Sequence, residues 1–101
     1  MMTSDALKDA ITEVRRLVKM QLPDIPVEDV DVREGADLSG DPSLFVTITT
    51  TAPVPPHRIG AKNDLRRHFR DWLANQDEER FPYFRFTTPE NEAERASSDV
   101  S

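Results

Sequence analysis

The chain has 101 residues, a net charge of −6 and no cysteine. A chain of this length fits one domain with a modest core, and the lack of cysteine excludes disulfides, thiolate catalysis and Cys-based metal sites. The charged fraction of 32% indicates a heavily solvated surface, and the negative balance disfavours nucleic acid as a general partner.

The first predicted element is a helix over residues 4–21. Ser4 is a suitable N-cap, and Asp5 follows in the first turn, where a carboxylate favours the helix dipole. Apolar residues then recur at helical spacing and form one stripe, namely Leu7, Ala10, Ile11, Val14, Leu17 and Val18. Pro23 ends the pattern.

Two strands follow, and we expect them to pair as a hairpin. Val30 and Val32 alternate with charged residues, which is typical of a half-buried strand. Residues 35–42 are rich in turn formers, and residues 44–51 are β-branched and aromatic. In that second strand the inward face holds Leu44, Val46 and Ile48, and the other face holds Phe45, Thr47 and Thr49.

The second half of the chain predicts a helix and then a third strand. Prolines 53, 55 and 56 end the sheet, and apolar spacing indicates a helix that starts near Ala61, because Gly60 weakens the first turn, and runs to Asn75. The stripe of this helix contains Ile59, Leu65, Phe69, Trp72 and Leu73. Residues 81–87 form the third strand, with Pro82 at its start or on an edge.

These elements predict an α+β fold in two layers, with the order α-β-β-α-β. Both helices should cover one face of a three-stranded sheet, because each helix has one apolar stripe. We expect residues 1–88 to form a single domain, and residues 89–101, which are acidic and contain serine, to form a disordered tail. The pattern leaves the order of the strands open.

Membrane and secretion signals are missing from the sequence. No stretch approaches the roughly 20 apolar residues of a membrane span, and the N-terminus lacks the charged and apolar regions of a signal peptide. We therefore expect a cytoplasmic protein without a membrane partner, which the cysteine-free composition suits.

Metal and catalytic constellations are also missing. His57 and His68 have no second histidine at helical metal-ligand spacing, so we expect no metal and no cofactor. The acidic stretch from Glu28 to Asp41 could serve acid–base chemistry or bind calcium, but its spacing does not match an EF-hand, and such a row is usually a solvated strand face. The prediction is a protein that is not an enzyme.

The second helix carries a basic face that leaves several interpretations open. Lys62, Arg66 and Arg70 step by four and share one stripe, with Arg67 beside it. Such a stripe can track phosphates. It could also bind an acidic protein or a second copy of the chain, or be an ordinary solvated face, which surface charge usually is.

The order α-β-β-α-β, with Gly60 near the start of the second helix, is similar to type II KH domains. That resemblance implies a nucleic-acid-binding protein that clamps the backbone at a Gly-x-x-Gly turn. Here Gly60 matches the first glycine, and Asn63 replaces the second.

A second resemblance covers more of the chain. Val30-x-Val32, the segment Asp37-x-x-Gly40-Asp41-Pro42-Ser43-Leu44-Phe45-Val46, the arginine-rich helix and Arg80-Phe81-Pro82-Tyr83 look like small uncharacterised bacterial proteins, some of them encoded beside toxin-type partners. The resemblance implies an accessory or antitoxin-like protein that binds another protein.

Tyr83 and Arg85 are the predicted partner-binding residues. They alternate with Phe84 and Phe86, which should face the core, so they should point outward from the third strand. Tyrosine and arginine dominate interface energetics. The favoured function is therefore protein binding or self-association, either through this face or by pairing of an edge strand, and ordinary cross-strand packing is the simpler role.

Overall fold

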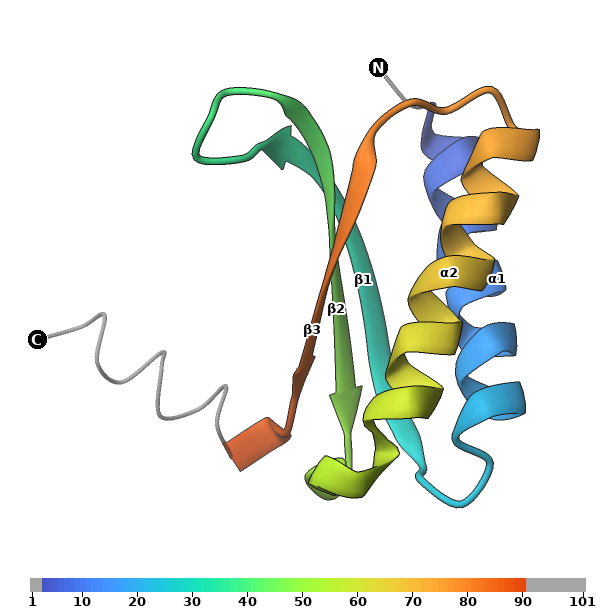
Figure 1. Ribbon diagram of the computed structural model, residues 1–101, viewed down its shortest axis with the longest axis vertical. Helices are drawn as coiled ribbons and strands as arrows, with labels where there is room; N and C mark the ends of the chain where they lie inside the picture. The colour runs from blue at the N-terminus through green and yellow to red at the C-terminus, as the bar shows by residue number, and fades with distance from the viewer. Residues whose placement is uncertain (1–2, 91–101) are drawn as a thin grey trace, which may run out of the picture.

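The structure is a computed structural model that describes residues 3–90. Its elements are, in chain order, α1 (Ser4–Gln21), β1 (Val27–Ala36), β2 (Pro42–Thr50), the 3₁₀ turn η1 (Pro56–Arg58), α2 (Ile59–Asn75) and β3 (Phe81–Thr87). Both helices lie against the same face of a three-stranded sheet (Figure 1). The predicted α-β-β-α-β order and two-layer α+β class are confirmed. Of the predicted tail, residues 91–101 lie outside the described residues.

Helix α1 has the predicted bounds, but its N-cap is Thr3 rather than Ser4. Thr3 has an extended backbone, and its hydroxyl oxygen accepts a hydrogen bond of 3.0 Å from the amide of Ala6. Ser4 is already helical. Two hydroxyl residues stand side by side here, and the sequence alone does not decide which of them leaves the helical region.

The sheet has the order β1-β2-β3, with β2 in the centre. Strands β1 and β2 form the predicted antiparallel hairpin, and β3 runs parallel to β2 after the crossover through α2. Strand β3 is therefore an edge, and Pro82 occupies its second position, where a missing N–H is tolerated. This placement of Pro82 agrees with the prediction.

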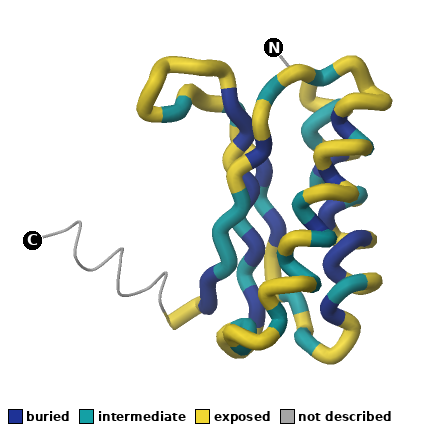
Figure 2. The backbone as a smooth tube through the Cα atoms, in the orientation of Figure 1, coloured by how far each residue is buried: buried dark blue, intermediate teal, exposed yellow. Residues whose placement is uncertain are grey.

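The core lies between the helices and the sheet, where the buried segments of Figure 2 face one another. Val46 and Ile48 of β2 are buried, as the alternation predicts. Phe84 and Phe86 of β3 are half-buried and pack against the core. The ring of Phe84 meets that of Phe69 edge-on, with 5.6 Å between the centroids.

Helix α2 begins at Ile59, earlier than predicted, because η1 leads directly into it. Gly60 lies in its first turn. Leu65, Phe69 and Leu73 are buried, but Ile59 is 63% exposed, so the predicted core stripe is wrong at that position. The apolar stripe turns toward the sheet only after the first turn. Neither helix within residues 3–90 is long and apolar enough to cross a membrane.

Candidate functional site

The sheet face opposite the helices is the candidate site, and the strand register arranges its side chains in rows. One row runs from Arg33 through Phe45 to Tyr83, and the next runs from Asp31 through Thr47 to Arg85. We call this surface the outer sheet face, and its residues are Asp29, Asp31, Arg33, Phe45, Thr47, Thr49, Tyr83 and Arg85.

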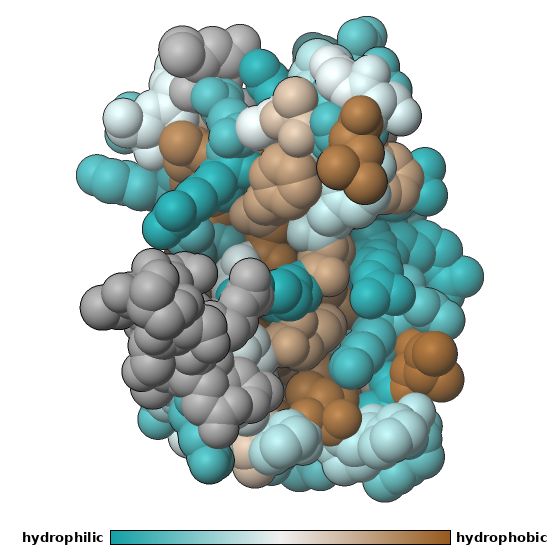
Figure 3. Space-filling view, turned by 90° about the vertical axis from the view of Figure 1, so that its left-hand side faces the viewer, coloured by the Kyte–Doolittle hydropathy of each residue, from teal (hydrophilic) through white to brown (hydrophobic). Residues whose placement is uncertain are grey.

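The outer sheet face is hollowed into an open depression of about 550 Å³ that these residues line together with Val46 and Phe84. Figure 3 shows this side of the molecule, where hydrophobic side chains run down the middle between hydrophilic ones. The exposed half of the sheet thus combines apolar rings with charged groups, a composition that resembles protein interfaces.

Three aromatic rings form a cluster at the hairpin end of this face. Tyr83 stacks on Phe45 with 5.8 Å between the ring centroids, and it meets Phe81 at 4.9 Å. Phe45, Phe81 and Tyr83 are 37%, 45% and 41% exposed. Leu38 is fully exposed on the neighbouring hairpin loop. The aromatic cluster of Phe45, Phe81 and Tyr83 is therefore contiguous and accessible, which marks it as a surface able to bind.

Asp37 joins the hairpin loop to this cluster. Its carboxylate accepts hydrogen bonds from the amides of Ser39 (2.9 Å) and Asp41 (3.0 Å) and from the hydroxyl of Tyr83 (3.1 Å). These bonds, foremost the one from the Asp41 amide, hold the pKa of Asp37 below its ordinary value. The same contact raises the pKa of Tyr83, because ionising the phenol would lose the hydrogen bond and place two negative charges together.

Gly35 provides the surface on which Phe45 rests. A Cβ atom at this glycine would lie 2.7 Å from Cε2 of Phe45, closer than van der Waals contact allows. The ring therefore covers the glycine backbone, a cross-strand arrangement in which an aromatic side chain shields a strand glycine. Gly35 thereby helps to fix where the aromatic cluster stands.

The structure places both predicted partner-binding residues on the outer sheet face. Tyr83 is exposed and Arg85 is half-buried. Their outward direction follows the alternation along β3, and the register adds Phe45 beside Tyr83. Phe81, two residues before Tyr83, was missed as a site residue, although the same period of two would have placed it outward.

The predicted basic stripe runs along the side of α2 that borders β3. The ammonium of Lys62 lies 4.9 Å from the centre of the Phe86 ring, and the guanidinium of Arg70 lies 5.0 Å from that of Phe81. Local polar partners hold the remaining two side chains, since Arg66 donates to Asn63 at 3.1 Å and Arg67 pairs with Asp64. All four cations thus have intramolecular contacts.

The acidic stretch does not converge on one point. Asp31 accepts a 2.6 Å hydrogen bond from Arg33 on the outer sheet face, and Asp37 organises the hairpin loop. Glu34 is on the opposite side of β1, 4.0 Å from Arg80. His57 and His68 are exposed. Across residues 3–90, no three acidic or histidine side chains gather closely enough to hold a metal ion.

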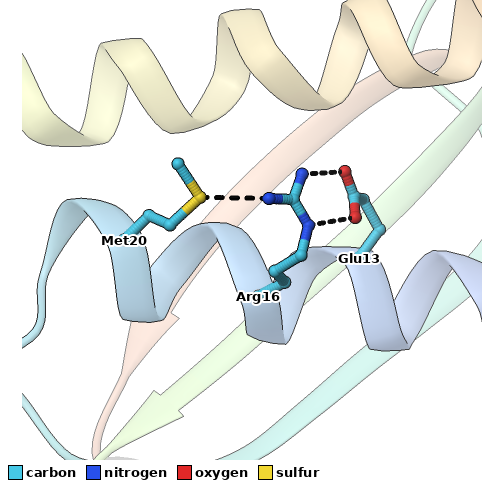
Figure 4. A network of polar contacts seen from close by, with 3 residues as sticks. All are labelled: Glu13, Arg16 and Met20. Carbon is cyan, nitrogen blue, oxygen red and sulfur yellow. Dashed lines mark hydrogen bonds and ion pairs between the residues drawn. The ribbon is translucent and has the colours of Figure 1, made fainter.

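A second polar network lies on α1, away from the outer sheet face. Arg16 binds Glu13 through two hydrogen bonds of 2.7 and 2.6 Å and donates a third to the sulfur of Met20 at 3.1 Å (Figure 4). The bonds from Arg16 lower the pKa of Glu13. Pairs at this spacing support the helix by a few tenths of a kcal/mol, which accounts for the network without a further role.

Comparison of the chain with models of protein families, with curated proteins and with solved structures finds no match.

Proposed function

We propose that this chain is a small non-enzymatic module that binds another protein through the outer sheet face, with Tyr83 and Arg85 as contact residues. The observation that carries the proposal is the aromatic cluster, in which three contiguous rings are each more than a third exposed. An accessory or antitoxin-like role, which the resemblance to small bacterial proteins implies, is consistent with such a module. A reducing cytoplasm suits its cysteine-free sequence.

The free energy gained by covering exposed aromatic rings favours binding of a partner at this surface. Covering an aromatic side chain removes a large apolar area from water, at about 25 cal/mol per Å². Tyrosine and arginine are enriched among the few residues that carry most of the energy of a protein interface, and here they stand in adjacent rows of one sheet. Cross-strand stacking of Phe45 and Tyr83 stabilises the sheet as well, and the experiment below separates the two roles.

The shape of the outer sheet face supports a binding role rather than a catalytic one. Catalytic acids and bases are found in enclosed sites that shift their pKa values. The depression here is open to solvent, and Asp31 is paired with Arg33 at 2.6 Å. The two groups on this side with shifted pKa values, Asp37 and Tyr83, are explained by their mutual hydrogen bond and the hairpin turn.

Nucleic-acid binding through Lys62, Arg66, Arg67 and Arg70 is the rival function. The intramolecular contacts of these side chains and the net charge of −6 both weaken it. The rival predicts binding that falls steeply with salt, because each neutralised phosphate releases counterions, and that is lost on replacing Arg66 and Arg70 with Glu. An interface of apolar rings should lose far less affinity in salt.

The test is an affinity pull-down from native cells with tagged protein. The double variant Tyr83→Ala/Arg85→Ala should lose the captured partner while keeping its fold, which the fluorescence of the single tryptophan, Trp72, reports. A matched control, Lys19→Ala/Met20→Ala, removes one cation and one large side chain from the exposed surface of α1 and should retain the partner. Unchanged capture by the Tyr83/Arg85 variant would show that the interface lies elsewhere.

A further inference from the structure

The charges of the outer sheet face are balanced, and one row of this face holds opposite charges at its two ends. Asp31 lies on β1 and Arg85 lies on β3, with Thr47 of β2 between them in one row. The face holds two carboxylates, Asp29 and Asp31, and two guanidinium groups, Arg33 and Arg85. Its formal charge is therefore zero, so the net charge of −6 is carried by the rest of the chain. Two such faces can meet without bringing like net charge together.

The row from Asp31 to Arg85 can pair with the same row of a second copy when a twofold axis turns one sheet onto the other. Two sheets that pack face to face align their strands within about 30° and lie about 10 Å apart. A twofold axis parallel to β2, passing over Thr47, keeps each row at its level and exchanges the two edges. Asp31 of each copy, which also binds Arg33 of its own copy at 2.6 Å, then faces Arg85 of the other copy, which makes two ion pairs across the interface.

The same operation also matches the neighbouring row. Arg33 of one copy comes to lie over Tyr83 of the other, where a guanidinium and an aromatic face attract. Phe45 meets Phe45 near the axis. A twofold axis perpendicular to the strands that also passes over Thr47 would place Asp31 over Asp31 and Arg85 over Arg85, which like-charge repulsion disfavours. Of the two twofold axes that pass over Thr47, the register therefore favours the one that runs along β2.

We propose that the protein bound by the outer sheet face is a second copy of this chain, in an isologous dimer whose twofold axis runs along β2 and pairs Asp31 with Arg85. This inference deepens the proposed function and rests on it. A closed twofold dimer is the commonest form of self-association in soluble proteins. It would cover the aromatic cluster of both copies at once.

The size of the face bears on whether the two copies can form a stable dimer. All three strands are paired over the seven residues of β3, and with strands about 4.8 Å apart and a rise of about 3.3 Å per residue this shared part has a footprint of roughly 330 Å². Stable interfaces bury about 800 Å² on each partner. The side chains that project from the sheet and the hairpin loop must therefore contribute further buried area. We therefore expect a weak, reversible dimer whose population rises with protein concentration.

Sedimentation velocity on the full chain, up to about millimolar concentration, tests the arrangement through charge reversal. Asp31→Arg and Arg85→Asp should each weaken self-association by about ten-fold or more, because each places two like-charge contacts in the interface. An equimolar mixture of the two variants should associate again, since every contact then joins opposite charges. The double variant Asp31→Arg/Arg85→Asp should also recover association. Asp9→Arg and Lys8→Asp, the same reversals on the exposed side of α1, serve as controls and should leave it unchanged.

Several outcomes would overturn the dimer. One is a chain that stays monomeric at every concentration, and another is association that ignores both reversals or is not recovered by mixing. A third is a concentration-independent NMR contact between the aromatic cluster and residues 91–101, which would make the chain's own C-terminal segment the occupant. In each case the pull-down with the Tyr83/Arg85 variant still decides the proposed function separately, because a different protein could bind the same face.

Discussion

The hydroxyl of Tyr83 donates a 3.1 Å hydrogen bond to Oδ2 of Asp37, across 46 residues of sequence. The bond joins edge strand β3 to the loop of the β1–β2 hairpin. It holds one end of the Tyr83 ring while Phe45 stacks on its face. A ring fixed in this way loses little conformational freedom when a partner covers it, which favours binding.

Replacing Asp37 with Asn should lower the pKa of Tyr83 toward its ordinary value of 10.0, because the negative charge that disfavours the phenolate is removed. The amide oxygen of Asn can still accept the backbone hydrogen bonds of the turn. Tyr83 is the only tyrosine of the chain, so absorbance of the phenolate near 295 nm follows this one group.

The stability of the fold should depend on pH in two ranges, because folding lowers the pKa of Asp37 and raises that of Tyr83. The raised pKa of Tyr83 adds stability that is complete below pH 10 and lost as pH rises through that pKa. The lowered pKa of Asp37 adds stability that is present above its ordinary value of 3.8 and lost as pH falls.

The control for the titration of Tyr83 is Asp71→Asn, an exposed change on α2 that should leave the pKa of Tyr83 unchanged. An identical titration in wild type and Asp37→Asn would contradict the hydrogen bond.

Phe84→Ala should destabilise the fold by about 3 kcal/mol, the lower end of the range for removing a core phenylalanine, because the ring is half-buried. It loses its edge-on contact with Phe69. Phe81 points away from the core and is 45% exposed. Phe81→Ala should therefore cost under about 1 kcal/mol. Urea unfolding followed by Trp72 fluorescence measures both, and equal losses would contradict the assigned faces of β3.

Local patterns were sufficient to predict most of the fold. The apolar stripe ending at Pro23 gave the bounds of α1, and alternation gave the faces of β2 and β3. Sheet order was not predictable, because it depends on which strand edges meet after the α2 crossover. The exposure of Ile59 was also missed, since spacing alone does not show where a helix turns away from the sheet.

The sequence predicted which way the side chains of the candidate site point, but not which residues contact one another there. Alternation along β3 predicted that Tyr83 and Arg85 point outward, which the structure shows. The contact of Tyr83 with Asp37 and that of Phe45 with Gly35 join distant or cross-strand positions. Such contacts depend on register, which a single sequence specifies only through its hydrophobic pattern. That the outer sheet face binds a protein stays a prediction.

Gly60→Ala should stabilise the protein by about 0.5 kcal/mol, because alanine restricts the unfolded chain and favours the first turn of α2. A Cβ atom there would have no neighbour within 4 Å. Gly40 is the matched comparison, since it also has open space but a φ of +84°. Gly40→Ala should therefore cost about 1 kcal/mol. Thermal unfolding resolves the two, and a loss of stability in Gly60→Ala would show that the glycine is required in that turn.

Gly35→Ala should move the Phe45 ring while leaving the fold nearly as stable, within about 1 kcal/mol. The new methyl group would lie 2.7 Å from Cε2 of Phe45, and an exposed ring can rotate away from it. Its stacking on Tyr83, at 5.8 Å between the centroids, should then be lost. NMR shifts of the Tyr83 ring protons measure this, because a neighbouring ring displaces them. Gly60→Ala should leave those shifts unchanged, and so should Gly35→Ala if Phe45 does not rest on the glycine. If binding at the outer sheet face needs the three rings in fixed positions, Gly35→Ala should also weaken that binding. If exposure of the rings is sufficient, the affinity should stay the same.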